Sequence, residues 1–226
     1  MLARKCTPQR IHSVVVGGAP PTSTAGADRS PPAGPSSRLL PRPERRRSIV
    51  AGAARAFAAT GFEATSMEEI AESAGVSKLI VYRHFESKEE LYRCILEQAA
   101  GRLAQLVAAA LGGDRPAQMR TAVVGAFMAA AREDPDGFRL LWRHSWREPR
   151  FARYAAEVNQ AAVDYARGFL APRLADRRLV DWAAATVVRF LVEATLNWLD
   201  HGSPEGDEEI VALTSASLLA LVRTWS

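Results

Sequence analysis

The sequence predicts an all-α protein, in which a three-helix helix-turn-helix unit is followed by a helical C-terminal part. Two observations carry this expectation. Apolar residues recur at helical spacing after residue 42, and no segment alternates in the manner of a strand or hairpin. Residues 65–91 also contain two short helical segments joined by a glycine and then the start of another helix.

The first short helix begins after Ser66, because Ser66-x-x-Glu69 is a capping box in which each side chain satisfies a backbone N–H group. Gly75 ends this helix, since glycine adopts the left-handed backbone conformation that turns the chain sharply. The inward stripe between these two points consists of Met67, Ile70, Ala71 and Ala74.

The second short helix is expected from Ser77, its N-cap, to Phe85. Only Val81 and Phe85 fall on its apolar stripe. Exposed aliphatic, aromatic and cationic side chains together make a poor solvent face but suit the major groove of DNA, so this segment is predicted to be a recognition helix. The residues expected to face outward are Lys78, Leu79, Ile80, Tyr82, Arg83 and His84.

The next helix opens with a second capping box, Ser87-x-x-Glu90, and places Lys88 in its first turn. The positive end of the helix dipole disfavours a cation there by roughly 0.3–1 kcal/mol. Two explanations stay open. Lys88 contacts a DNA phosphate, or it is an ordinary surface lysine.

Four motifs between about residues 49 and 96 occur together: the helix IVAGAARAF with Gly61-Phe62 after it, the Thr65-Ser66 start, the AGVSK turn, and YRHFESKEEL. In this combination the stretch resembles the N-terminal DNA-binding domain of the TetR family of bacterial transcriptional regulators. The resemblance implies a protein that binds double-stranded DNA and regulates transcription.

The resemblance also implies roles for individual residues. Tyr82, His84 and Lys88 match positions that grip phosphates, and residues 77–80 match positions that approach bases or backbone. The full set expected to bind DNA is Arg46, Arg47, Thr65, Ser66, Ser77, Lys78, Leu79, Ile80, Tyr82, Arg83, His84 and Lys88.

Three residues depart from the family pattern. Leu79 and Ile80 stand where the family often has a small residue and threonine. Neither side chain can hydrogen-bond to a base edge, so we expect apolar contact with thymine methyl groups or packing against sugars. Gly52 stands where alanine is usual, and a glycine inside a helix costs roughly 1 kcal/mol.

Positive charge is concentrated at the start of the chain. Residues 1–47 hold 9 of the 29 Lys and Arg residues and 2 of the 25 Asp and Glu residues, a net charge of +7. The other 179 residues hold 20 and 23, a net charge of −3. Overall basicity is therefore a poor argument for DNA binding, and the local placement of cations has to carry it.

Residues 1–41 are rich in Pro, Ser and Gly and are expected to form a disordered tail. Three interpretations of this tail stay open. It is a basic arm that reaches along DNA, an inert tail or overlong start, or a transit peptide.

Several functional classes lack their sequence signatures. No segment reaches the roughly 18 apolar residues of a membrane-spanning helix. The chain has no P-loop, nucleophile-elbow or zinc-protease motif and no Cys/His cluster at metal spacing, so we expect neither an enzyme nor a metal or cofactor site. Cys6 and Cys94 cannot form a disulfide framework, which fits the reducing cytoplasm.

After Leu96 the chain is expected to remain helical. The helix that opens at Ser87 runs to Leu111, where glycine stops it, and connects the DNA-binding part to the rest. The predicted domains are residues 42–102 for DNA binding and residues 103–226 for effector binding and dimerisation. The further helices are predicted at residues 116–132, 135–146, 149–170, 178–201 and 206–225.

The last two predicted helices are apolar over more of their circumference than a monomer core needs. In the resembled family the final two helices of two subunits form a four-helix interface, and two recognition helices about 34–36 Å apart suit a pseudo-palindromic operator. A homodimer is therefore expected, and the alternative is that both helices are inner core. The expected interface residues are Val187, Leu191, Trp198, Leu213, Leu218 and Leu221.

The middle helices are expected to hold a chamber for a small-molecule effector, because aromatic residues and a few polar groups gather there. The alternative is that these aromatic residues are plain core. The expected lining is Phe127, Met128, Trp142, Trp146, Asn159, Tyr165, Phe169 and Glu193, with Phe138, Leu141, His144 and Tyr154 as further candidates.

Together these features predict a homodimeric repressor that a small molecule releases from its operator. Two alternatives stay open. One is a DNA binder without an effector, and the other is a helical module whose exposed Leu79, Ile80 and Tyr82 meet a protein partner. Salt distinguishes them, because phosphate-driven binding weakens steeply as salt rises.

Overall fold

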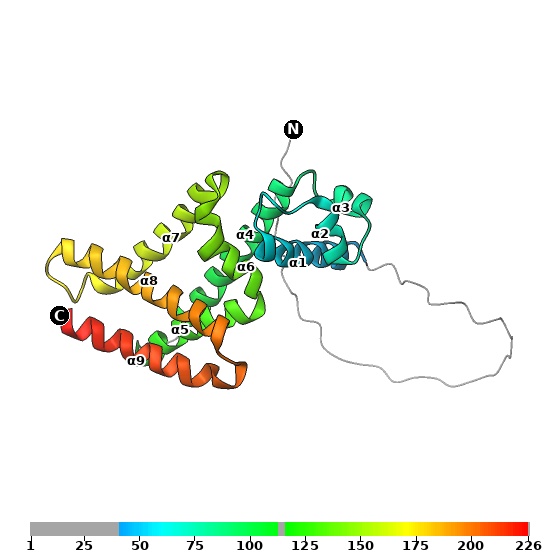
Figure 1. The fold of residues 1–226 in the computed structure, drawn as a ribbon. Helices are drawn as coiled ribbons and strands as arrows, with labels where there is room; N and C mark the ends of the chain where they lie inside the picture. Colours follow the sequence, from blue (N-terminus) through cyan, green and yellow to red (C-terminus); the bar gives the residue numbers. More distant parts are fainter. Residues whose placement is uncertain (1–40, 113–115, 226) are drawn as a thin grey trace, which may run out of the picture.

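A computed structural model describes residues 41–112 and 116–225, with the side chains of residues 41–112 and 121–225. The described residues are helical and contain no strand, which confirms the all-α expectation (Figure 1). The α-helices are α1 Arg42–Thr60, α2 Met67–Ala74, α3 Lys78–His84, α4 Lys88–Leu111, α5 Pro116–Glu133, α6 Pro135–Arg139, α7 Pro149–Leu170, α8 Arg177–His201 and α9 Asp207–Trp225.

Helix α2 forms as its sequence predicts. The Glu69 N–H group donates to Ser66 Oγ at 3.2 Å, and the Ser66 N–H group donates to the Glu69 carboxylate at 2.6 Å. Gly75 has φ 66° and follows the last residue of α2, so it makes the left-handed turn into α3. The predicted capping box and glycine turn are both confirmed.

Gly52 has a role that the sequence did not indicate. A β-carbon at Gly52 would lie 2.7 Å from both the Cα and the N atom of Ala74. Ser48, one turn earlier in α1, donates its hydroxyl to the Ala74 carbonyl at 3.1 Å. The absence of a side chain at Gly52 therefore lets the end of α2 lie directly against α1.

The start of α4 differs from the predicted capping box. Ser87 Oγ accepts from the Glu90 N–H group at 3.1 Å, as expected. The Glu90 carboxylate, however, accepts from the N–H group of Glu86 at 2.7 Å rather than from Ser87. The cap thus satisfies two backbone donors, but the second donor is the N–H group of Glu86 instead of that of Ser87.

An aromatic cluster joins the helix-turn-helix unit to α7. The rings of Phe62, Tyr92 and Phe151 are all buried, with centroids 5.2 Å apart for Phe62–Tyr92 and 4.4 Å apart for Tyr92–Phe151. Beside them, the Arg150 guanidinium lies 2.6 Å from the Glu89 carboxylate. The N-terminal end of α7 is therefore packed against the DNA-binding unit.

The remaining helices form a bundle around α5. Helix α4 runs beside α5, α8 packs on α5 and α7, and α9 packs on α5 and α8. Helix α9 lies on the far side of the molecule from α3 (Figure 1). By length and composition α4 could cross a membrane, a property that core helices of soluble proteins share, and here it packs against α1 and α5.

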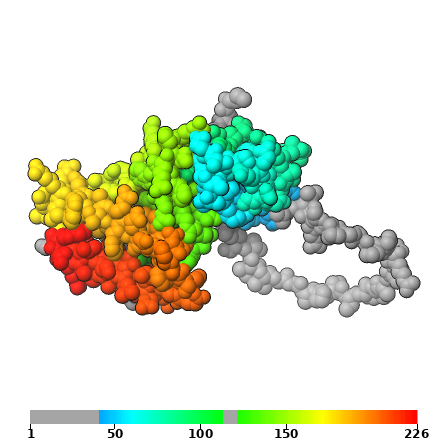
Figure 2. All heavy atoms as spheres, in the orientation of Figure 1, coloured from blue at the N-terminus to red at the C-terminus, as the bar shows by residue number. Residues whose placement is uncertain are grey.

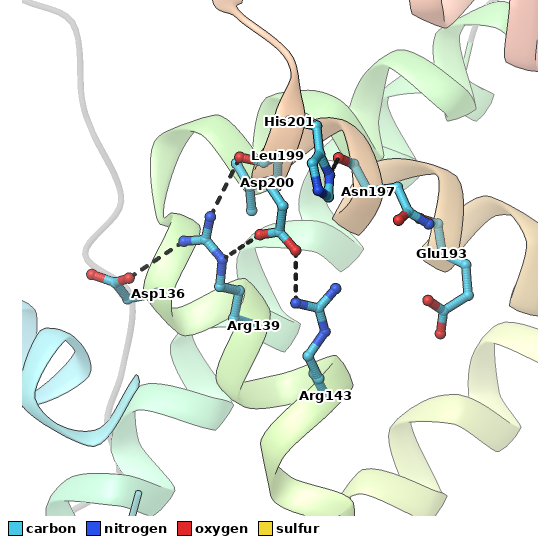
Figure 3. Close-up of polar contacts among 8 residues, drawn as sticks. All are labelled: Asp136, Arg139, Arg143, Glu193, Asn197, Leu199, Asp200 and His201. Carbon is cyan, nitrogen blue, oxygen red and sulfur yellow. Dashed lines mark hydrogen bonds and ion pairs between the residues drawn. The ribbon is translucent and has the colours of Figure 1, made fainter. Parts of the chain in front are cut away.

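One predicted helix, residues 135–146, is not a single regular helix. Helix α6 ends at Arg139 and is followed by a π-helical turn at Leu140–His144 and a 3-10 turn at Ser145–Arg147. Arg139 and Arg143 both bind Asp200 near the end of α8, with N–O distances of 3.0 and 2.7 Å (Figure 3). Hydrophobic spacing alone does not distinguish these turns from an α-helix, because the apolar side of the segment stays buried in either case.

Candidate DNA-binding surface

Helix α3 presents a mixed face to solvent. Leu79 is 62% exposed and Tyr82 is 46% exposed, and Ser77, Lys78 and Arg83 are also exposed. Val81 and Phe85 are buried, as the sequence predicts. Exposed aliphatic, aromatic and cationic side chains thus follow one another on α3 within two turns.

Ile80 does not belong to this exposed face. It is only partly exposed and packs against the core of the unit, so its predicted outward position is wrong. The turn from α2 rotates α3 so that Leu79, and not its neighbour, points away from the protein. Ser77 occupies the N-cap position with extended backbone, but its side chain makes no capping hydrogen bond.

Lys78 is oriented by its neighbours. Its ammonium pairs with the Glu68 carboxylate of α2 and lies 5.8 Å from the centre of the Tyr82 ring. Both partners of the ion pair are about half exposed, so the pair positions Lys78 at the surface without burying it. An approaching phosphate would compete with Glu68 for this ammonium.

Cations from the start of α1 gather at the end of α3. The positive charges of Arg42, Arg45 and Arg46, together with partial burial as the largest cause, lower the pKa of His84. Arg46 also lies over the Phe85 ring at 4.6 Å and donates to Cys94 Sγ at 3.4 Å, so part of its side chain packs inside the unit. A phosphate beside His84 would meet several positive charges.

Arg42 belongs to this group of cations but was not among the residues predicted to bind DNA. Its signal is the helical spacing of Arg42, Arg45 and Arg46, which places all three on one side of α1. Arg47, which was predicted to bind DNA, is exposed on α1.

Two predicted DNA-binding residues use their hydroxyls within the protein. Thr65 is 1% exposed, and its hydroxyl bonds to Thr60 Oγ1 at 2.8 Å and to the Gly61 carbonyl at 2.6 Å. Ser66 uses its hydroxyl in the α2 cap. The buried Thr65 side chain is therefore not available to DNA, which contradicts its predicted role. Ser66 is partly exposed and caps α2, and its contact with DNA stays a prediction.

Lys88 also has an internal role. Its ammonium donates to the carbonyls of Phe62, Glu63 and Thr65 at 2.8, 3.1 and 3.2 Å, and it lies 4.6 Å from the centre of the Phe62 ring. An ammonium has three N–H donors, so these carbonyls satisfy all of them. In this structure Lys88 holds the loop between α1 and α2 against α4, which leaves no free donor for the predicted phosphate contact.

The residues predicted to line an effector chamber occupy different environments. Phe127, Met128 and Trp142 are buried, and Asn159 is partly exposed. The predicted lining is therefore not assembled around one enclosed space in this structure. The exposed members are Trp146, Tyr165, Phe169 and Glu193.

One buried group in this region lacks a partner. The indole N–H of Trp142 is buried and has no hydrogen-bond acceptor among the described residues. Trp142 lies in the π-helical turn, and its ring centroid is 6.4 Å from those of Phe127 and Phe138.

The outer surface of α8 and α9 is apolar and open. Figure 2 shows the atoms of these two helices as one continuous surface with no other element over it in this view. Trp182 and Leu213 are 53% and 55% exposed. Two hollows of about 380 and 430 Å³ lie here; the first is lined by Phe190, Trp198 and Leu213 among others, and the second by Trp182 and Phe190 among others.

Part of the predicted dimer interface faces the core instead. Leu191 is 5% exposed, so it was assigned to the wrong face. Val187 and Leu218 are partly exposed and partly packed against the core, and their place in the interface stays a prediction. Leu213 and Trp198 belong to the open surface, and Leu221 is partly exposed. The signal that finds the outer face is the four-residue spacing of Trp182, Thr186, Phe190 and Ala194.

The tail predicted for residues 1–41 lies outside the described residues except for Pro41. The predicted domain boundary between residues 102 and 103 falls inside α4, which continues unbroken across it.

Comparisons with known proteins agree with the helix-turn-helix geometry. Residues 49–95 match the model of the bacterial regulatory proteins of the tetR family. The HTH-type transcriptional activator FasR of Mycolicibacterium smegmatis is 32% identical over 178 residues, which cover 76% of this chain and 81% of FasR.

Two solved structures show the same fold. A TetR-family transcriptional regulator from Bordetella parapertussis superposes with a TM-score of 0.67 at 21% identity, covering 77% of this chain and 93% of its own. AibR, solved in complex with isovaleryl coenzyme A and operator DNA, gives a TM-score of 0.61 at 19% identity, covering 77% of this chain and 97% of its own. With the FasR relationship and the matched N-terminal domain, they lead to one conclusion: the chain belongs to the TetR family of DNA-binding transcriptional regulators, which are not enzymes.

Proposed function

We propose that the protein acts in the cytoplasm as a homodimer that binds a pseudo-palindromic operator through α3 and represses transcription until a small molecule releases it. The observation that carries the DNA-binding step is the exposed face of α3, with Leu79, Tyr82 and Arg83, and the arginines of α1 that lie near His84 at its end. Phosphate contacts from these cations supply affinity, and side chains on α3 supply sequence discrimination.

The open surface of α8 and α9 supports dimerisation. It presents Trp182, Phe190 and Leu213 to solvent over two adjacent helices, and an apolar surface of this kind is unfavourable in a monomer. A second copy packed on it in a two-fold arrangement covers the same residues of both subunits. Two recognition helices then face two successive turns of the major groove.

Trp142 supports an effector site in the C-terminal part. A buried N–H group without an acceptor costs about 1–3 kcal/mol, and a ligand carbonyl or carboxylate beside it would remove that cost. AibR, which has this fold, binds isovaleryl coenzyme A, so we propose a small molecule with a carbonyl group as the first class to test. The bound molecule would shift the distance between the two recognition helices and so loosen DNA binding by about 5- to 150-fold.

A second candidate function, activation of transcription instead of repression, has specific support. FasR, which aligns over 76% of the chain, is a transcriptional activator. Activation uses the same dimer and the same operator, and differs in where the operator lies relative to the promoter.

The direct test is to select bound sites from random duplex DNA with the purified full chain. The proposal expects two inverted half-sites whose centres are about 10–10.5 base pairs apart, or a multiple of that spacing. Recovery of no preferred sequence would overturn it. A reporter gene with the selected site, with and without the regulator, then separates repression from activation.

A carbonyl-containing effector is tested by titrating the protein–operator complex with acyl-coenzyme A and free carboxylic acids. Release by any of them in the wild type but not in Trp142→Phe supports the proposed role of the indole N–H group. Equal release from both proteins contradicts that role.

A further inference from the structure

Leu79 is the most exposed aliphatic side chain on the DNA-binding surface. It is 62% exposed, whereas Ile80 and Val81, its neighbours on α3, are partly or fully buried. Helix α3 is described in full, and Leu79 is the one aliphatic residue that it presents to solvent. An isolated leucine at this point gains nothing for the fold, because no described core residue covers it.

The side chains around Leu79 are polar or aromatic. Lys78 is held by Glu68, and Tyr82 lies one turn further along the same face of α3. Leu79 therefore projects from the middle of a polar surface, near the N-terminal end of α3. In a helix-turn-helix this end of the recognition helix approaches base edges in the major groove.

The major groove offers one apolar group. Guanine, cytosine and adenine present only hydrogen-bond donors and acceptors along that edge, whereas thymine also presents its C5-methyl group. A leucine cannot hydrogen-bond to any base edge. Contact with a thymine methyl is the one favourable direct readout that its chemistry allows.

The geometry points to Leu79 as a specificity-determining residue that reads a thymine methyl group in each half-site of the operator. This inference rests on the proposed operator binding and adds the base that the surface prefers. Burying one methyl group against the leucine is expected to strengthen binding about fourfold for each half-site. Cytosine at the same position lacks the methyl and presents a polar amino group instead, so it is rejected.

The test replaces thymine by uracil, one position at a time, in the selected operator. Uracil pairs as thymine does and lacks only the C5-methyl group, so the duplex loses nothing but the apolar contact. Wild-type protein is expected to bind about fourfold more weakly when uracil stands at the contacted position of one half-site, and about 16-fold more weakly when it stands in both.

The matching protein variant is Leu79→Ser. It removes the apolar side chain at an exposed position, so its melting temperature should stay close to that of the wild type. Its affinity for the thymine and uracil operators should agree within about 1.5-fold. Tyr82→Phe serves as a control, since it changes a phenolic hydroxyl and should keep the fourfold preference for thymine.

A duplex with 5-methylcytosine paired to guanine adds a second comparison, because this base restores a methyl group at the same place. Tighter binding to it than to unmodified cytosine by the wild type, but not by Leu79→Ser, supports the inference. Equal affinity of the wild type for thymine and uracil at every position would overturn it, while leaving operator binding intact. Absence of any preferred duplex would instead overturn the proposed function, and this inference with it.

Discussion

Lys88 is an unusual residue for the first turn of a helix, and its explanation is a contact with residues far away in the sequence. A lysine in the first turn of α4 opposes the helix dipole, and the sequence offered phosphate binding as the reason. The structure places three carbonyls of the loop after α1 around its ammonium. Those carbonyls come from residues more than twenty positions earlier, so no local pattern could have indicated them.

Exchanging Lys88 or Lys78 for methionine separates a structural lysine from a DNA-binding one. Lys88→Met should lower the free energy of unfolding by about 1–3 kcal/mol, because three loop carbonyls lose their donor, while the remaining folded protein keeps the salt dependence of operator binding. Lys78→Met removes only an exposed ion pair, so stability should change by less than about 1 kcal/mol. It should instead reduce the salt slope of binding by about one for each subunit.

Urea denaturation and operator titrations between about 50 and 200 mM salt measure the two effects. Two results would contradict a structural role for Lys88. One is a Lys88→Met protein with unchanged stability, and the other is a Lys88→Met protein whose salt slope falls by the amount expected for Lys78→Met.

His84 predicts a pH dependence. Partial burial and then Arg42, Arg45 and Arg46 lower its pKa in the free protein, and a DNA phosphate nearby would raise that pKa again. The complex then binds more protons than the free protein, so operator affinity should rise as pH falls from 8 to 6, by at most about tenfold per pH unit for each His84. Fluorescence titrations should show a flatter profile for His84→Gln.

The lowered pKa of His84 also makes the stability of the DNA-free protein depend on pH, and this stability falls with decreasing pH while operator affinity rises. Because the folded pKa lies below the unfolded one, the unfolded chain takes up the proton first as pH falls through about 6.5, and the DNA-free protein loses stability there. An operator affinity that falls with decreasing pH in the wild type would exclude the proposed phosphate near His84.

The helices themselves were largely predictable, because their ends carry local chemistry. The box at Ser66 and Glu69, the left-handed Gly75 and the stop at Gly112 are all where the sequence placed them. The π-helical turn at Leu140–His144 was not predictable, since it changes the hydrogen-bond pattern without changing which side is buried. Gly52 looked like a defect because its contact, the backbone of Ala74, lies on another helix.

Two glycine substitutions should have opposite effects. Gly52→Ala puts a methyl group within 3 Å of the Ala74 backbone, so it should lower the free energy of unfolding by about 1–3 kcal/mol and weaken operator binding as α2 and α3 shift. Gly101→Ala in α4 meets nothing within 4 Å and should stabilise the protein by about 0.5–1 kcal/mol through helix propensity. Thermal melts of both variants check this, and a stabilised Gly52→Ala protein would refute the close contact.

The assembly of distant parts was the least predictable feature of the molecule. Helical periodicity marks the apolar residues of α8 and α9 but does not say which belong to the core and which to an outer face, so Leu191 was assigned outward and Trp182 was not singled out for the interface. The aromatic contact between Phe151 of α7 and Tyr92 of α4 likewise depends on a fold that brings residues 59 positions apart together. It packs the start of α7 against the DNA-binding unit.

A charge on the outer face of α8 and α9 should abolish the dimer. Leu213→Glu puts a carboxylate on the surface that we propose pairs with a second subunit, so the protein should become monomeric and bind the operator at least about tenfold more weakly. Tyr165→Glu on α7 is the matched control, as Tyr165 is 49% exposed and outside that surface. Light scattering gives the mass of each variant, and a dimeric Leu213→Glu protein would place the interface elsewhere.

Operator binding by the exposed face of α3 can be tested with one titration. The selected operator is titrated with wild-type protein and with the double variant Tyr82→Ala, Arg83→Ala, after circular dichroism and light scattering have shown that the variant is folded and has the wild-type mass. Both side chains are exposed, so the account predicts an intact protein with at least about 100-fold weaker operator binding. Operator affinity equal to that of the wild type would contradict it.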